Sequence, residues 1–210
     1  METEHIKTKR FVKSWLTCVG ELQQDHQKFS KYLLKVLVEQ GKCSLGDFES
    51  QNLNARRLKA LAKKRPTIHF NESHQIDGHA GLTLKETGIE LKSELGEVYA
   101  VSAWDALAIP ILVNRNFALR STCVVGGEEI EVQLTPLGYE TQQESIYLSF
   151  FHPDVLTLDI CQTVGQWSSF VVGEENTIKY LEEHPDQILL PLSQSFQMAR
   201  EVSQAMYKDA

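Results

Sequence analysis

The chain has 210 residues, of which 42% are hydrophobic and 23% charged, a composition typical of one large globular domain or two small ones. Its formal net charge of −7 disfavours nucleic-acid binding by the molecule as a whole. The longest apolar stretch, Ala106–Val113, contains Pro110 and is too short to cross a bilayer. The charged N-terminus does not resemble a secretory signal. We therefore expect a cytoplasmic protein without a membrane partner.

Four cysteines are scattered along the chain: Cys18, Cys43, Cys123 and Cys161. None forms the short-spaced pair that a structural zinc site usually needs, so we expect no zinc. In a reducing cytosol they should be free thiols. Each, taken alone, is better explained as an inert buried hydrophobe than as a reactive group.

The first third of the chain has a helical pattern from about Phe11 to Lys64. Apolar residues predict a first amphipathic helix from Phe11 to Val19 and a stronger one from Phe29 to Val38, ended by Gly41. A third helix begins near Asn52 or Asn54 and stops before Pro66.

Strand-like segments follow: Thr67–Phe70, a polar turn over Asn71–Gly78, and Gly81–Leu84. Three helices and a hairpin are the order of a winged helix-turn-helix, so residues 1–84 are predicted to form such a region. The third helix, Asn54–Lys64, is rich in Arg and Lys and lacks acidic residues. In a DNA-binding winged helix it would read the groove; a solvated helix face explains the same charges. Both interpretations stay open.

Residues 85–210 mix strands and helices, so the predicted fold class is α+β. A hairpin is predicted around Gly126–Gly127, with Ile130, Val132 and Leu134 on its buried face. The remaining predicted elements are strands at Val98–Val101, Ser149–Phe151 and Leu156–Ile160, and helices at Ala103–Leu112, Thr177–Glu183 and Ser193–Lys208.

Asp105 is a carboxylate inside an otherwise apolar run. Burial disfavours the ionised form and raises the pKa of a carboxyl group, as a general acid at neutral pH requires. A structural role is the alternative, because Asp three residues after Ser102 can lie in the first turn of a helix. The residue types alone favour that structural role.

Two segments carry a resemblance to a known family: Gly81-Leu-Thr-Leu-Lys-Glu-Thr87 and Tyr99-Ala-Val-Ser-Ala-Trp-Asp-Ala-Leu107, followed by Pro110. They resemble the alkylmercury lyases, whose segments read G-L-T-L-x-E-T and Y-A-W-C-A-x-D-T-L. The similarity continues through Arg120–Cys123 and Trp167–Ser169, and it is weaker at Asp159–Cys161, where it rests on spacing. A winged-helix N-terminus ahead of the lyase core, here residues 85–210, is also a feature of the family.

The resemblance implies an organomercurial lyase that cleaves carbon–mercury bonds by protonolysis to give a hydrocarbon and Hg(II). Asp105 stands at the proton donor, Cys161 at the second mercury-binding thiol, and Cys123 at a structural cysteine. Ser102 stands where the first thiol is expected, so the mercury site would comprise Cys161, Ser102 and Asp105. No cofactor is implied, because mercury is bound as substrate or product. The implied partners are an organomercurial and the cellular thiols or mercuric reductase that accept Hg(II).

The serine leaves the activity open, because a hydroxyl is a much poorer mercury ligand than a thiolate. One soft ligand at Cys161 suffices in the first hypothesis. In the second, the site is catalytically altered and the chain is a metal-responsive or DNA-binding regulator acting through Asn54–Lys64. In the third, an unrelated enzyme or ligand-binding protein uses the same pocket. Retention of both Asp105 and Cys161 favours the lyase.

Overall fold

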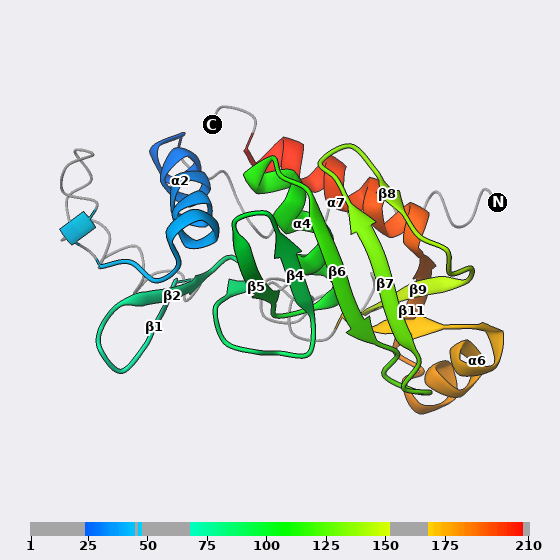
Figure 1. Cartoon of the computed structure of the whole chain (residues 1–210). Coiled ribbons are helices and arrows are strands. Elements are labelled where there is room, and N and C mark those ends of the chain that lie inside the picture. Colours follow the sequence, from blue (N-terminus) through cyan, green and yellow to red (C-terminus); the bar gives the residue numbers. More distant parts are fainter. Residues whose placement is uncertain (1–23, 45, 48–67, 152–167, 208–210) are drawn as a thin grey trace.

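A computed structural model describes residues 24–44, 46–47, 68–151 and 168–207 (Figure 1). Within these ranges the chain forms four α-helices and two antiparallel sheets, which confirms the predicted α+β class. The predicted first and third helices, the latter with its basic side chains, lie outside the described residues, as does the predicted strand at Leu156–Ile160.

Helix α2, Gln24–Gln40, is the described helix of the N-terminal region. Leu33, Leu34 and Leu37 on its apolar face are fully buried, as the amphipathic pattern predicts. The chain leaves the helix at Gly41, which has φ +78° and donates its N–H to the Leu37 carbonyl at 3.1 Å. Glycine suits this left-handed position because it has no Cβ, and the predicted helix end is confirmed.

The main sheet has eight strands in the order β1-β2-β3-β5-β4-β6-β7-β8, and all neighbours are antiparallel. The strands are β1 Ile68–Phe70, β2 Ile76–His79, β3 Leu82–Thr83, β4 Glu90–Ser93, β5 Gly96–Ala100, β6 Phe117–Thr122, β7 Glu129–Leu134 and β8 Tyr139–Glu140. The predicted division between residues 84 and 85 falls between β3 and β4 of this one sheet, and it stays a prediction.

Strand β2 corrects the predicted turn over Asn71–Gly78, which ends before Ile76. All four residues of β2 are buried, although only Ile76 is a large hydrophobe. The polar members are accommodated by partners elsewhere in the chain: Asp77 forms an ion pair with Lys85, and His79 is hydrogen-bonded to α2. A strand of this composition shows no alternation of apolar and polar residues, so local pattern could not reveal it.

The β6–β7 hairpin forms where the sequence predicts it. Its strands stop at Thr122 and resume at Glu129, and Gly127 has the expected positive φ of +76°. Ile130, Val132 and Leu134 are buried while their neighbours along β7 are exposed, as expected for a strand with one face in the core.

A smaller sheet has the order β10-β9-β11. Its strands are β9 Ile146–Phe151, β10 Phe170–Val172 and β11 Gln187–Pro191, and the remaining helices are α4 Ala103–Val113, α6 Glu174–Glu183 and α7 Leu192–Met206. Helices α4 and α7 lie together behind the main sheet, whereas α6 lies beside the small one (Figure 1). The three helices predicted in this region are therefore confirmed. No helix in the described ranges is both long and apolar enough to cross a membrane.

Candidate active site

Helix α4 begins at the second of the two informative segments. Ser102 is its N-cap, with extended backbone angles of φ −143° and ψ 166°. The Ser102 hydroxyl oxygen accepts the backbone N–H of Asp105 at 3.2 Å, which satisfies one of the free N–H groups at the start of a helix. The structural role that the sequence predicts for this pair is therefore present.

The same hydroxyl also contacts the acid. Ser102 Oγ donates a hydrogen bond to Asp105 Oδ2 at 2.7 Å, and Ser102 is only 2% exposed. A serine hydroxyl has one hydrogen and two lone pairs. Asp105 thus takes the hydrogen and one lone pair of Ser102, which leaves one lone pair for any other ligand.

Burial raises the pKa of the Asp105 carboxyl from 3.8 to about 7, although hydrogen bonds from the Ser102 side chain and backbone lower it. Desolvation outweighs the hydrogen bonds because water no longer stabilises the charged form. Near neutral pH a substantial fraction of Asp105 therefore carries a proton. That is the property a general acid needs.

The β2–β3 turn forms another side of the site. Its two residues, Ala80 and Gly81, have φ +48° and +85°, as in the type I′ turns of tight hairpins. A Cβ atom at Gly81 would collide with Cβ, Cγ and Oδ1 of Asp105. The two segments that carry the family resemblance therefore meet at the carboxyl group of Asp105.

Backbone hydrogen bonds keep these segments aligned. The Val101 N–H donates to the Gly81 carbonyl at 2.8 Å. The Thr87 hydroxyl donates to the Ala100 carbonyl at 2.5 Å, and the Ala100 N–H donates to the Ile89 carbonyl at 3.0 Å. The ends of the first segment are thus attached to the residues just before Ser102.

Ser168 is a neighbour of the site to which the sequence assigned no role. Its carbonyl accepts the N–H of Ala103, the first residue of α4, at 2.9 Å. Ser168 is 5% exposed, and its hydroxyl is one of two buried side-chain polar atoms without a hydrogen-bond partner in the described part of the chain; the other is Asp77 Oδ1. The Trp167–Ser169 spacing was the only signal for it.

Of the three predicted site residues, the structure brings Ser102 and Asp105 into direct contact. Cys161 lies outside the described residues, so its convergence with the other two stays a prediction, as does the assignment of catalytic and mercury-binding roles. Cys18 also lies outside them.

The two described cysteines have structural surroundings. The Cys123 sulfur, buried at the end of β6, accepts the backbone N–H groups of Gly126 at 3.5 Å and Val172 at 3.4 Å. The pKa of Cys43 is raised to about 11 by burial and then by the charge of Asp47. Because only a thiolate is a strong mercury ligand, Cys43 is a poor candidate for metal binding.

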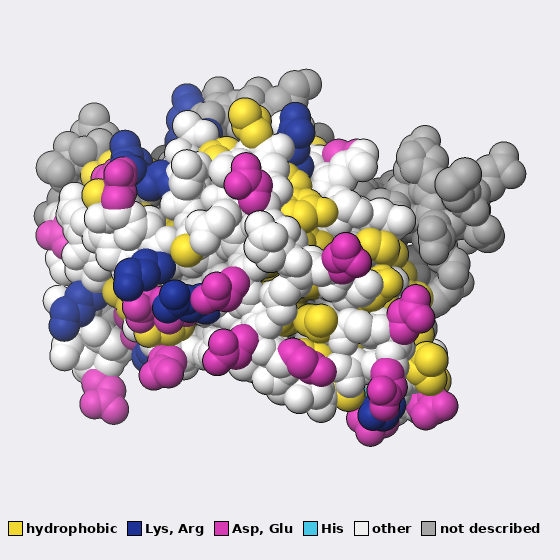
Figure 2. Space-filling view, turned by 45° about the vertical axis from the view of Figure 1, so that its right-hand side comes forward, with side chains coloured by type: hydrophobic (Ala, Val, Ile, Leu, Met, Phe, Trp, Pro, Cys, Tyr) yellow, Lys and Arg dark blue, Asp and Glu magenta, His cyan; other side chains and the backbone are white. Residues whose placement is uncertain are grey.

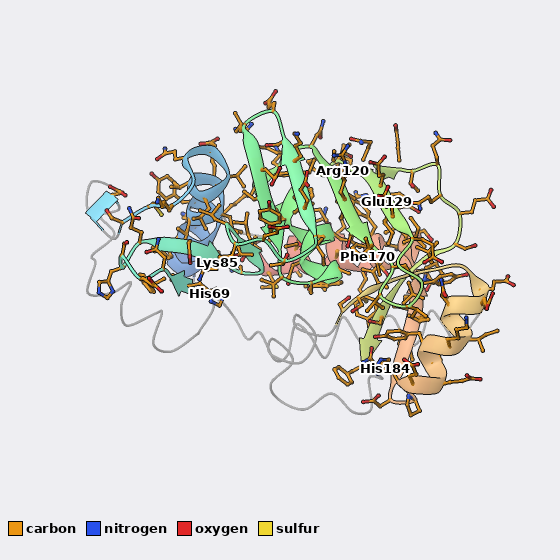
Figure 3. The ribbon with its side chains drawn as sticks, turned by 60° about the horizontal axis from the view of Figure 1, so that its bottom comes forward. His69, Lys85, Arg120, Glu129, Phe170 and His184 are labelled. Atoms are coloured by element: carbon orange, nitrogen blue, oxygen red, sulfur yellow. The ribbon has the colours of Figure 1, made fainter. Side chains whose placement is uncertain are left out.

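The charges of the described surface are distributed rather than gathered at the site. Acidic side chains are spread over the face in Figure 2, and no basic stripe crosses its described part. Lys85, near β1 and β2, pairs with Asp77, and Arg120, on the opposite part of the sheet, pairs with Glu131 (Figure 3). The described ranges contain no group of three His, Cys, Asp or Glu residues placed to hold a metal ion.

Comparison with known proteins supports the family resemblance carried by the two segments. The family model of the alkylmercury lyases (MerB) matches residues 82–204. An alkylmercury lyase of Staphylococcus epidermidis is 24% identical over 183 residues, which cover 85% of this chain and 82% of that protein. An alkylmercury lyase of Bacillus cereus is 26% identical over 147 residues, which cover 68% of this chain and 65% of that protein.

The fold agrees as well. A crystal structure described as the mercury-bound form of MerB2 superposes with a TM-score of 0.78 at 14% identity, covering 94% of this chain and 99% of that one. At that identity the likeness establishes the fold alone. The family model, in contrast, matches more than half of the sequence and includes Ser102, Asp105 and Cys161. This chain belongs to the alkylmercury lyase family.

Proposed function

We propose that this protein cleaves carbon–mercury bonds by protonolysis, giving a hydrocarbon and Hg(II). The observation that carries the proposal is the hydrogen bond from Ser102 to Asp105 at 2.7 Å, around a carboxyl group whose pKa burial raises to about 7. A carboxylic acid that still holds its proton near neutral pH is suited to protonating carbon. The relatives named alkylmercury lyases support the same reaction.

In this mechanism Cys161 binds the substrate. Its thiolate displaces the solution ligand X⁻ from the organomercurial R–Hg–X, so that a sulfur–mercury bond replaces the mercury–X bond, because mercury is a soft metal. The electron pair of the carbon–mercury bond then takes the proton of Asp105, so the hydrocarbon leaves and Hg(II) remains on Cys161. Cellular thiols or a mercuric reductase remove Hg(II), and solvent returns a proton to Asp105. No cofactor takes part.

Ser102 acts on the acid in this proposal. Its hydroxyl hydrogen is directed to Oδ2 of Asp105, which leaves Oδ1 to carry the transferable proton. After transfer the same hydrogen bond stabilises the carboxylate. The remaining Ser102 lone pair offers mercury only a weak oxygen ligand. We infer that Cys161 is the principal mercury ligand.

Hydrocarbon release tests the proposal. The purified protein, incubated with methylmercury or phenylmercury and excess thiol, should release methane or benzene, measured by gas chromatography. Cys161→Ser and Asp105→Asn should abolish release because they remove the mercury ligand and the proton. Cys43→Ser, which removes a buried and protonated thiol, should retain it. Release by the unaltered chain no greater than by Cys161→Ser would contradict the proposal.

We also infer that residues 1–84 form a winged-helix region, that residues 85–210 form the lyase core, and that the protein is cytoplasmic. Helix α2 followed by the β1–β2 hairpin supports the first inference. The regulatory alternative has its own test: salt-dependent DNA binding that weakens on charge reversal at Arg56 and Arg57 would favour it.

A further inference from the structure

The β2–β3 turn closes one side of the acid in the proposed mechanism. We propose that Gly81 is a positioning residue for Asp105: the carboxyl group occupies the space that any side chain at position 81 would fill, and the turn holds it against Ser102. This inference rests on the proposed function in taking Asp105 as the acid, and it adds a residue from a different element to the site.

The contact at Gly81 is unusually close. A Cβ atom there would overlap Cβ, Cγ and Oδ1 of Asp105. These atoms belong to a short side chain on the first turn of α4. The other carboxyl oxygen of this side chain, Oδ2, accepts the hydrogen bond from Ser102. Asp105 could therefore give way only by shifting its Cβ and turning its carboxyl group, which would lengthen or break that hydrogen bond.

The turn itself is held on both sides. Before the turn, His79 is buried, and its Nε2 is hydrogen-bonded to Ser30 Oγ on α2 at 2.6 Å. After it, Leu82 is fully buried and pairs with Ala100. Ala80, between them, has a φ of +48°, which an L-residue adopts only when its surroundings impose it. The turn is therefore a poor candidate for moving away from Asp105.

Placement against Gly81 also keeps the carboxyl group from water. Burial is the largest cause of the raised Asp105 pKa, and the closely packed turn contributes to that burial. We expect a methyl group at position 81 to displace the carboxyl group from this closely packed position and to admit water beside it. Solvation favours the ionised form, so the Asp105 pKa should fall.

The test compares Gly81→Ala with Gly88→Ala. Both glycines have nearly the same φ, +85° and +81°, but a Cβ at Gly88 meets no atom within 4 Å. Gly88→Ala therefore imposes the backbone strain without the collision. Titration of the Asp105 carboxyl carbon by NMR, assigned with Asp105→Asn, should show its acid dissociation constant raised about tenfold or more in Gly81→Ala, one pKa unit. Gly88→Ala should match the unaltered chain.

A second readout is the pH dependence of hydrocarbon release. Gly81→Ala should move its upper limit to lower pH, whereas a merely structural change would lower activity at every pH. An Asp105 titration in folded Gly81→Ala that matches Gly88→Ala would overturn the positioning role, even if the unaltered chain releases hydrocarbon. A shifted titration with no release by the unaltered chain would reject the proposed function and keep the positioning role.

Folding of the variant is itself informative. If Gly81→Ala does not fold, adding Asp105→Gly should restore folding, because it removes Cβ, Cγ and Oδ1, all three of the colliding atoms. A double variant as unstable as Gly81→Ala alone would show that the collision with the carboxyl group is not the cause, and would overturn the proposal.

Discussion

At Ser102 one hydroxyl serves both the start of a helix and the acid three residues later. It accepts the Asp105 N–H and donates to the Asp105 carboxyl. Capping and acid positioning are therefore a single arrangement, and the structural and chemical interpretations of Asp105 are compatible. The raised pKa of Asp105 distinguishes this arrangement from an ordinary capping pair, because carboxylates at helix starts are usually favoured in their ionised form.

Restoring a thiol at position 102 should strengthen mercury binding. Ser102→Cys is expected to raise the affinity for Hg(II) at least tenfold, since a thiolate is a far better mercury ligand than a hydroxyl. Competition with a small dithiol of known affinity measures the change, and Ser102→Ala is the control without a ligand. An unchanged affinity in Ser102→Cys would mean that residue 102 does not face the mercury held by Cys161.

The pH dependence follows from the raised Asp105 pKa. In the proposed mechanism the protonated acid is the active form, so hydrocarbon release should fall as pH rises through about 7. The free energy of unfolding should also fall as pH rises. The folded state binds this proton more tightly than the unfolded chain, whose carboxyl has an ordinary pKa. The stabilisation is therefore present at low pH and is lost as pH rises toward 7.

Urea unfolding at pH 5 and pH 8 measures this contribution. The unaltered chain should lose more stability over that interval than Asp105→Asn, which cannot titrate at position 105. Equal losses in the two proteins would show that Asp105 does not have a raised pKa.

At the scale of elements, the site is made where three of them meet: the start of α4, the β2–β3 turn and the segment entering β10. Hydrogen bonds of Val101 with Gly81 and of Ala103 with Ser168 hold them together. The β6–β7 hairpin is attached to β10 in a similar way, through Cys123 and Val172. Each attachment joins segments far apart in the sequence.

Cys123 should contribute to stability rather than to chemistry. Cys123→Ala leaves the N–H groups of Gly126 and Val172 without their sulfur acceptor, so the free energy of unfolding should fall by about 1–3 kcal/mol. Urea denaturation measures the loss. Hydrocarbon release per folded molecule should be unchanged, and a selective loss of release in a stably folded variant would contradict the structural role.

At the scale of the whole molecule, buried polar contacts connect the two ends of the described chain. Ser30 on α2 is hydrogen-bonded to His79 on β2 and, at 2.9 Å, to the hydroxyl of Tyr207 after α7. A further link joins Arg115, after α4, to Glu39 on α2 at 2.5 Å. Helix α2 is thus fixed to the same body as the candidate site.

Removing the Ser30 hydroxyl should destabilise the whole molecule. Ser30→Ala takes a partner from two buried polar side chains, so we expect a loss of about 1–3 kcal/mol in the free energy of unfolding, measured in urea. Ser73→Ala, at an exposed loop position, should change it by less than about 0.5 kcal/mol. Similar effects of the two substitutions would show that the Ser30 contacts contribute little.

The sequence by itself determined the features that depend on local pattern. Periodic apolar residues and a glycine predicted helix α2 and its end, and alternating residues around Gly126–Gly127 predicted the β6–β7 hairpin. The apolar run around Asp105 predicted that its carboxyl group is buried. These signals are local because side-chain direction repeats every 3.6 residues in a helix and every two in a strand.

Only the tertiary structure decided what depends on residues distant in the chain. Strand β2 is hidden in the sequence because its polar residues are buried by partners such as Ser30, 49 residues away from His79. The close approach of Gly81 to Asp105 and the position of Ser168 beside Ala103 likewise arise from packing between elements. Composition and spacing describe one segment at a time, whereas the raised pKa of Asp105 depends on every segment that excludes water from it.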